Sequence, residues 1–241
     1  MKLLNEKYGI KEADFLSAEL EAVPSFPAVD IGFDRSMIGS YGHDDRVCAY
    51  PSIMAAMAAK KPEFTTVTVI TDKEEIGSDG NTGLNSSFLK QFISDLAALD
   101  GKPGRDALRK SECLSADVNA GFDPTFPSVH DKMNAAYLNR GIVLTKYTGS
   151  RGKSGTNDAN AEFVSKVRNI FDASKTVWQT GELGKVDEGG GGTVAKYIAN
   201  LGVDVVDVGV PVLSMHAPFE VVAKTDVYMA YKGFKAFLES K

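Results

Sequence analysis

The sequence has too few cysteines for several kinds of site. Cys48 and Cys113 are the only two, so we expect neither a disulfide framework nor a structural zinc held by thiolates. Cys48 falls within an apolar helical pattern and is predicted to be a core residue, because free cysteine is among the most buried residue types. A reducing cytoplasm is the expected location.

Long apolar runs and an excess of positive charge are also lacking. No apolar run reaches the length that a membrane-spanning helix needs. Lysine and arginine together number 27 against 32 acidic residues, and the resulting net charge of −5 does not favour nucleic acid binding. We therefore expect neither a membrane nor a nucleic acid as partner.

The composition that remains is that of a globular protein. Hydrophobic residues make up 43% and charged residues 24% of the 241 residues, which fits one large domain or a domain with an appendage. Residues 1–34 are the candidate appendage, because they show no alternation of helices and strands. A strand is predicted over 15–23, and Pro24 and Pro27 end it.

The rest of the chain predicts an α/β fold, with a sheet covered by helices. Apolar spacing of three and four predicts helices over 45–59, 84–99, 106–112, 159–173, 193–201 and 226–238. Runs rich in β-branched residues predict strands over 65–70, 113–118, 142–146, 177–180, 205–208 and 210–213. This alternation is typical of layered α/β domains.

Two adjacent carboxylates follow the predicted strand over 65–70. Glu74 and Glu75 lie in a polar, glycine-punctuated turn, at the strand end where α/β sheets bind ligands. Like charges this close raise one another's pKa unless a cation lies between them. The pair therefore indicates a metal ligand beside a proton-transfer group, or alternatively a solvated acidic loop with Lys73 as partner.

Three further polar residues lie where predicted elements begin or end: Asp44, Asp117 and His216. Taken singly, Asp44 could cap a helix, Asp117 a loop, and His216 could be a rim residue. Taken together with Glu74 and Glu75 they favour a catalytic site for Zn²⁺, Mn²⁺ or Co²⁺. A two-metal hydrolase needs a bridging carboxylate, further ligands and a base for the attacking water.

Two loops are candidates for substrate binding. Successive N–H groups in the run Gly189–Gly192 could let Gly190 and Gly191 approach a substrate closely, or the run could be a flexible turn. In the basic loop over 146–153, Arg151 and Lys153 could hold a substrate carboxylate, or the loop could be a solvated surface.

These residues lie in motifs that resemble the aspartyl aminopeptidase family of zinc metallopeptidases, in particular its bacterial members. The matching stretches are YGHDDRVCAY at 41–50, DKEEIGS at 72–78, SAD at 115–117, WQTGELGKVDEGGGGT at 178–193 and PVLSMH at 211–216. They are specific, and the resemblance covers nearly the whole chain. It implies a mixed α/β sheet flanked by helices, as in other co-catalytic zinc exopeptidases.

The resemblance also implies roles for single residues. Asp44 resembles the carboxylate that bridges two zinc ions, and Glu74 the general base. Glu75 and His216 resemble the ligands that hold one zinc together with Asp44, and Asp117 resembles a ligand of the other. The implied reaction removes an N-terminal residue from a peptide, with acidic residues preferred in parts of the family. Family members form large homo-oligomers through an inserted domain.

One departure from the family is important for activity. The family's first zinc ligand is a histidine near the N-terminus of a much longer protein, and neither His43 nor His130 occupies its place. The resemblance thus implies that residues 1–34 are the last piece of the inserted oligomerisation domain, and that 35–241 are the C-terminal part of the catalytic domain.

Three functions follow as expectations. The first is a zinc aminopeptidase that is weak or inactive unless a partner supplies the missing half, with cobalt or manganese as alternative metals. The expected partners are further copies in a homo-oligomer, or the missing N-terminal half. The second is a non-catalytic assembly or binding subunit that retains the fold. The third is hydrolysis of another amide, such as an acylated amino acid, by the same metal chemistry.

Overall fold

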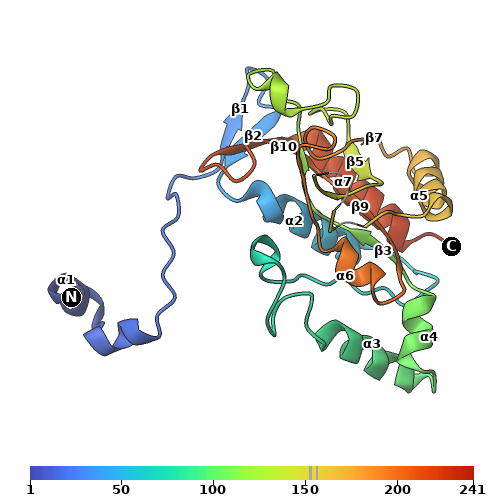
Figure 1. Ribbon diagram of the computed structural model, residues 1–241, viewed down its shortest axis with the longest axis horizontal. Coiled ribbons are helices and arrows are strands. Elements are labelled where there is room, and N and C mark those ends of the chain that lie inside the picture. Colours follow the sequence, from blue (N-terminus) through green and yellow to red (C-terminus); the bar gives the residue numbers. More distant parts are fainter. Residues whose placement is uncertain (152–153, 156) are drawn as a thin grey trace.

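The computed structural model describes residues 1–151, 154–155 and 157–241. Its described helices run in the order α1 (Lys2–Tyr8), α2 (His43–Ala58), α3 (Phe88–Leu99), α4 (Gly104–Arg109), α5 (Ala161–Ala173), α6 (Ala195–Ala199) and α7 (Lys224–Leu238). Short 3-10 turns are η1 (Glu12–Leu16), η2 (Glu74–Ile76) and η3 (Pro127–Val129). Figure 1 shows a body of helices around sheet, from which the first residues extend as an arm.

The described strands form two larger sheets and a small hairpin. One sheet has the order β1 (Val29–Ile31), β2 (Met37–Ser40), β11 (Glu220–Ala223), β10 (Pro211–Leu213) and β4 (Asn119–Ala120). The other has the order β3 (Glu112–Ser115), β9 (Asp204–Gly209), β5 (Ile142–Thr145) and β7 (Trp178–Thr180), and β6 (Gly149–Ser150) pairs with β8 (Gly190–Gly191). Both larger sheets mix parallel and antiparallel pairs.

The core lies between these sheets and three long helices. Strand β9 continues through the fully buried Val210 into β10, so one chain segment links the two larger sheets. Helices α2, α5 and α7 bury apolar side chains against it, among them Cys48, Phe171 and Phe234. The expected mixed α/β architecture flanked by helices is thereby confirmed, and Cys48 is a core residue with no exposed surface.

A smaller core cluster supports the side of the body where α3, α4 and α6 lie. Leu108 of α4, Ile198 of α6 and Val205 of β9 are buried there, with Leu89 and Ile93 of α3 packed against them. The amphipathic pattern that predicted the helix over 84–99 has its physical basis in this contact.

The predicted strand over 65–70 is wrong. No strand among the described residues pairs with this segment, and its side chains Val69 and Ile70 are 41% and 53% exposed. Only Asp72, just beyond it, forms a bridge, with Gly83. The β-branched composition expresses a local preference, but a strand also needs a neighbouring strand and a covered face, which the described chain does not supply here.

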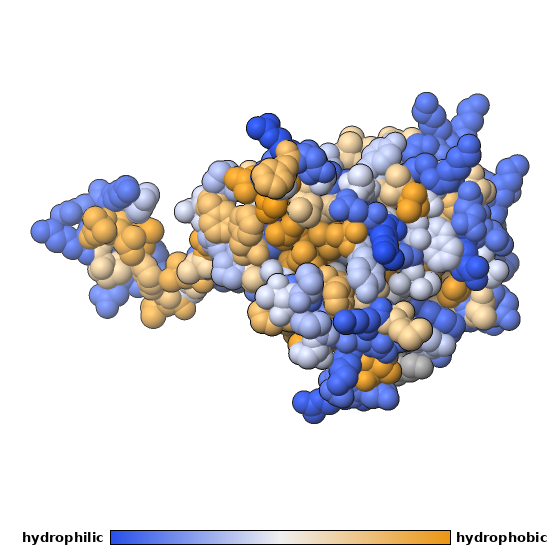
Figure 2. Space-filling model, turned by 90° about the horizontal axis from the view of Figure 1, so that it is seen from above, coloured by the Kyte–Doolittle hydropathy of each residue, from blue (hydrophilic) through white to orange (hydrophobic). Residues whose placement is uncertain are grey.

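The predicted strand over 15–23 is wrong for the same reason. Its first residues belong to the 3-10 turn η1, and Leu16 and Leu20 are 89% and 72% exposed. Figure 2 shows apolar side chains gathered on the arm and on the adjoining face of the body.

Among the described residues, no helix is both long and apolar enough to cross a membrane.

Candidate metal centre

The predicted ligands from three separate parts of the chain come together in space. The imidazole Nε2 of His216 lies 3.0 Å from Oδ2 of Asp44 and 3.1 Å from Oε1 of Glu75. One ligand atom from each of the three residues lies within 4.8 Å of the other two. An imidazole and two carboxylates at this spacing form a donor set that suits Zn²⁺, Co²⁺ or Mn²⁺.

Asp44 is shared by a second group. Its carboxylate, that of Asp45 and that of Asp117 also lie within 4.8 Å of one another. One carboxylate at the centre of two ligand groups is the arrangement that a bridged pair of metals needs. Asp45 was not among the ligands predicted from the sequence, so its place in the second group is a new observation.

Asp44 is positioned at the start of α2, immediately after β2 and the Tyr41–Gly42 turn. Its backbone departs from helical geometry, with φ −74° and ψ 116°, and its side chain is only 5% exposed. The carboxylate thus faces the site and is largely removed from water.

His216 lies in the turn between β10 and β11, and its side chain is 61% exposed. The turn has a left-handed backbone at two non-glycine residues, Ser214 (φ 58°) and His216 (φ 63°). The backbone N–H of Ala217 donates to the carbonyl of Ser214 at 2.9 Å, which closes the turn. The imidazole is therefore presented from a tight turn at the sheet end.

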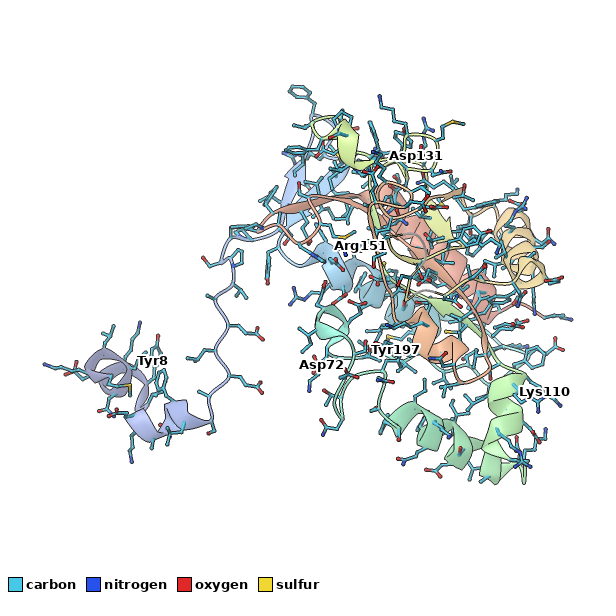
Figure 3. The ribbon with its side chains drawn as sticks, in the orientation of Figure 1. Tyr8, Asp72, Lys110, Asp131, Arg151 and Tyr197 are labelled. Carbon is cyan, nitrogen blue, oxygen red and sulfur yellow. The ribbon has the colours of Figure 1, made fainter. Side chains whose placement is uncertain are left out.

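Glu74 and Glu75 form the 3-10 turn η2, which starts after Lys73 (φ 64°) and ends at Gly77 (φ 97°). The hydroxyl of Tyr197 on α6 donates to the carbonyl of Gly77 at 2.9 Å. Figure 3 shows Tyr197 on the side of α6 that faces this turn, near the labelled Asp72. A side chain from a distant helix thus holds the turn that carries both carboxylates.

Asp117 follows β3, which pairs with the largely buried β9. Its Oδ1 accepts the N–H of Val118 at 2.8 Å. The main chain of Asp117 runs directly against Gly209, where an added Cβ would lie 1.4 Å from the Asp117 carbonyl oxygen. Glycine at 209 is required for this close approach.

Electrostatics at the site favour a bound cation. Burial, followed by the charges of Asp117 and Glu75, raises the pKa of Asp44 to about 9. Burial and the same two charges raise the pKa of Glu74 to about 8. Burial raises the pKa of Asp117 to about 6, although the Val118 N–H lowers it in part. Carboxyl groups packed this way ionise readily only when a cation compensates their charge.

The site opens to solvent through a cleft of about 390 Å³. Asp44, Glu75 and His216 line it, together with Arg46 and Tyr41. A cleft of this size has room for a small ligand or part of a larger one.

The two predicted substrate loops contact each other. Gly190 and Gly191 form β8, which pairs with Ser150 and Gly149 of β6, and the N–H of Arg151 donates to the carbonyl of Gly189 at 3.1 Å. Gly191 also lines a cavity of about 10 Å³ that reaches Asp117. Lys153 lies outside the described residues, and a substrate role for the loops stays a prediction.

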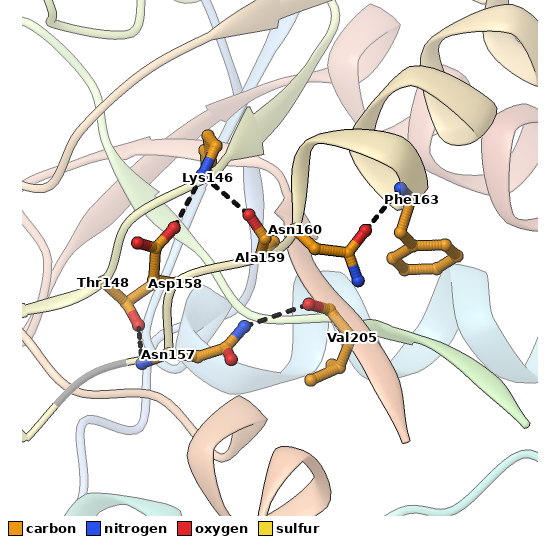
Figure 4. A network of polar contacts seen from close by, with 8 residues as sticks. All are labelled: Lys146, Thr148, Asn157, Asp158, Ala159, Asn160, Phe163 and Val205. Atoms are coloured by element: carbon orange, nitrogen blue, oxygen red, sulfur yellow. Dashed lines mark hydrogen bonds and ion pairs between the residues drawn. The ribbon is translucent and has the colours of Figure 1, made fainter. Parts of the chain in front are cut away.

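The base of the basic loop is fixed by a polar network (Figure 4). Lys146 donates to Asp158 at 2.6 Å and to the carbonyl of Ala159 at 2.7 Å. Asn157 donates to the carbonyl of Val205 on β9 at 3.0 Å. Lys146 therefore closes the base of the loop, and Asn157 ties it to β9.

Sequence reasoning missed Glu220 and Asp207. Glu220 is 2% exposed, and its carboxylate accepts the backbone N–H groups of both Asp44 and His216. Nothing in the sequence marks a single glutamate at the start of a short strand. Asp207 is 4% exposed in the middle of β9, and a carboxylate inside the apolar run over 205–208 was a signal that could have been noticed.

Comparison with known proteins agrees with the site. A family model for aminopeptidase I zinc metalloproteases (M18) matches residues 1–238. The chain belongs to this family. The resemblance to this family of zinc metallopeptidases is thereby confirmed. A probable aspartyl aminopeptidase from Ricinus communis is among the relatives, at 26% identity.

Bacterial members of the M18 family match the whole chain at high identity. A probable M18 family aminopeptidase 1 from Clostridium acetobutylicum is 52% identical over all of this chain and 52% of its own length. The crystal structure of aminopeptidase I from that organism superposes with a TM-score of 0.94, and the Thermotoga maritima M18 aminopeptidase, 44% identical, with 0.95. Both superpositions cover all of this chain. They cover 52% of the Clostridium acetobutylicum chain and 54% of the Thermotoga maritima chain.

The M18 fold extends to more distant proteins. The structure of the S. cerevisiae mApe1 dodecamer, 22% identical, has a TM-score of 0.74 over 89% of this chain and 48% of its own. At that identity the likeness shows the fold alone. This chain spans about half the length of the curated relatives it matches.

Proposed function

We propose that this chain carries the base and four metal ligands of a zinc-dependent aminopeptidase, which removes N-terminal residues from peptides. The observation that supports it is the group of Asp44, Glu75 and His216, whose ligand atoms lie within 4.8 Å of one another, with Asp44 shared by a second group. Acidic N-terminal residues are the substrate class to test first.

The residues present fit zinc. Asp44, Glu75 and His216 would be ligands of one ion. Asp44 and Asp117 would be two of the ligands of a second ion, and Asp45 is a further candidate ligand. A bound zinc polarises a peptide carbonyl and lowers the pKa of a bound water. Cobalt and manganese suit the same oxygen and nitrogen donors.

Glu74 is proposed as the general base. Its carboxylate lies within 4.8 Å of those of Glu75 and Asp45, and its pKa is raised to about 8 in the protein alone. A carboxyl group with a pKa near neutrality can accept a proton from the attacking water and return it to the leaving amine. Nearby positive charge would move this pKa downward, so that Glu74 is ionised when the site is loaded.

The hairpin of β6 and β8 is proposed to contact the substrate. Gly190 and Gly191 bring bare backbone to the side of the site where Asp117 lies. Arg151 follows β6, and with Lys153 it would supply positive charge for an acidic side chain or a carboxylate. This assignment explains both loops with one ligand.

The second metal position is proposed to be incomplete in this chain. Its described candidates, Asp44, Asp45 and Asp117, are all carboxylates, and the histidine that the resemblance implies is not among them. We propose that the chain is weak or inactive unless a partner supplies the missing half, and that its partners are further copies in a homo-oligomer or an N-terminal half. Residues 1–34 are then the last piece of the inserted oligomerisation domain, and 35–241 the C-terminal part of the catalytic domain.

A second candidate, a non-catalytic assembly subunit, has its own support. Exposed apolar side chains on the arm and in the segment over 65–70 await a covering surface. The S. cerevisiae relative is solved as a dodecamer. Free Cys48 and Cys113 fit the reducing cytoplasm that we propose for either function.

The test is hydrolysis of aminoacyl chromogenic substrates by the purified chain with zinc, cobalt or manganese, beside Glu74→Gln. We expect the chain alone to show weak turnover or none. Turnover should rise when the N-terminal half of a longer M18 relative is added, and it should be lost in the variant. Metal binding without turnover in any combination would favour the assembly subunit. Strong turnover by the chain alone would contradict the incomplete site.

A further inference from the structure

A single buried carboxylate joins the two segments that carry Asp44 and His216. Oε2 of Glu220 accepts the backbone N–H of Asp44 at 3.1 Å, and Oε1 accepts the backbone N–H of His216 at 2.8 Å. Glu220 itself is 2% exposed. Both oxygens of one rigid group thus fix the main chains of two residues that the proposed function assigns as ligands of the same ion.

The sheet explains why Glu220 reaches both. Strand β11 lies between β2 and β10, and Glu220, its first residue, is in register with Ser40, the last residue of β2. The chain leaves β2 toward Asp44, and it leaves β10 toward His216 before it returns as β11. Glu220 therefore lies at the sheet end between two loops that diverge from neighbouring strands.

The two bonds hold the main chain at positions where it would otherwise lack a partner or be strained. His216 has a left-handed backbone, which a non-glycine residue adopts only when its surroundings enforce it. Asp44 lies in the first turn of α2, where backbone N–H groups have no partner within the helix, and its N–H donates to Glu220. Without this acceptor, both N–H groups would depend on water for a partner, and neither main chain would be fixed relative to the other.

We propose that Glu220 is a positioning residue that sets the separation of Asp44 and His216, and through it the affinity of the site for zinc. The proposal rests on the proposed function, because it takes those two residues as ligands. Groups that orient metal ligands act on affinity, and their loss typically weakens metal binding by about 10- to 100-fold.

The protein offers a matched control in Asp226. This residue is fully buried at the start of α7, and its two oxygens likewise accept two backbone N–H groups, those of Asn139 and Gly141, both at 2.7 Å. Its partners precede β5, and none belongs to the metal-ligand groups found among the described residues. Glu220→Gln and Asp226→Asn therefore make the same chemical change, and only the first is made at the site.

The experiment measures cobalt and zinc affinity of the full chain by calorimetric titration, beside the free energy of unfolding in urea. We expect both variants to lose stability, and only Glu220→Gln to lose affinity, by about 10- to 100-fold. Equal affinity of Glu220→Gln and the unaltered chain would overturn the proposal. No binding by the unaltered chain would overturn the metal site and this inference with it.

A second measurement keeps the proposal testable if Glu220→Gln does not fold. Amide hydrogen exchange of the unaltered, metal-free chain is expected to show protected N–H groups at Asp44 and His216, because both are bonded to a buried acceptor. Exchange of the His216 N–H as fast as that of an open loop would contradict the positioning role.

Discussion

The imidazole Nε2 of His216 lies 3.0 Å from Oδ2 of Asp44, although one residue lies near the start of the chain and the other near its end. Neighbouring strands bring them together, because β2 and β10 both pair with β11. The candidate centre is therefore a product of the folded sheet, and changes to the sheet end should affect metal binding as well as stability.

The close approach at Gly209 gives the first prediction. A Cβ there would lie 1.4 Å from the Asp117 carbonyl oxygen, so Gly209→Ala should cost about 3 kcal/mol or more of unfolding free energy, or prevent folding. Urea unfolding measures this. Gly192→Ala, whose Cβ would meet its nearest neighbour at 3.4 Å, is the control and should change stability by less than about 1 kcal/mol. Equal losses of stability in the two variants would mean that Gly209 at the end of β9 lies further from Asp117 than the structure shows.

The second prediction separates apolar composition from burial. Ile142→Ala in β5 removes a side chain with no exposed surface and should cost about 2–5 kcal/mol. Ile70→Ala removes one that is 53% exposed and should cost less than about 1 kcal/mol in this chain. Comparable losses in urea unfolding would show that residues 65–70 are covered in solution.

The segment over 65–70 and the metal-ligand residues together show what the sequence could and could not predict. The grouping of Asp44, Asp117 and His216 was predictable, because each lies where an element begins or ends. Glu75 was placed with them by its motif, since the strand predicted before it is absent from the described part of the chain. The strand over 65–70 was predicted wrongly, since local propensity does not reveal whether a partner strand is present. Glu220 escaped notice because its role depends on a register between distant strands.

Buried Asp207 gives a dependence of stability on pH. Burial raises its pKa from 3.8 to about 7, with the Thr193 and Ser115 hydroxyls lowering it in part. The folded chain then keeps this proton to a higher pH than the unfolded chain. Its contribution to stability is present below about pH 4 and is lost as the pH rises to about 7, by up to about 1.4 kcal/mol per pH unit.

Urea unfolding at several pH values tests this expectation. Asp207→Asn cannot ionise, so its stability should fall less between pH about 4 and 7 than that of the unaltered chain. Asp187→Asn, at an exposed position that tolerates a left-handed backbone, is the control and should follow the unaltered chain. Parallel profiles for all three chains would show that Asp207 ionises at an ordinary pKa.

The hydroxyl of Tyr197 should affect the metal affinity of the site and contribute only a little to the stability of the fold. Tyr197→Phe removes the bond to the Gly77 carbonyl and should cost about 1 kcal/mol, because one neutral hydrogen bond is lost. Since the turn carries Glu74 and Glu75, cobalt affinity should fall as well, within about tenfold. Tyr228→Phe, at an exposed position of α7, is the control. Unchanged affinity in Tyr197→Phe would mean that the turn is held by other contacts.

The most direct measurement is the stoichiometry and affinity of cobalt or zinc for the full chain, beside His216→Ala and the control His130→Ala. His216 is 61% exposed, so His216→Ala should leave the fold intact. Because a ligand is lost, the affinity for the most tightly bound metal ion should fall by more than about 100-fold. His130→Ala should bind as the unaltered chain does. No metal binding by the unaltered chain, or equal binding by His216→Ala, would contradict a metal centre built on Asp44, Glu75 and His216.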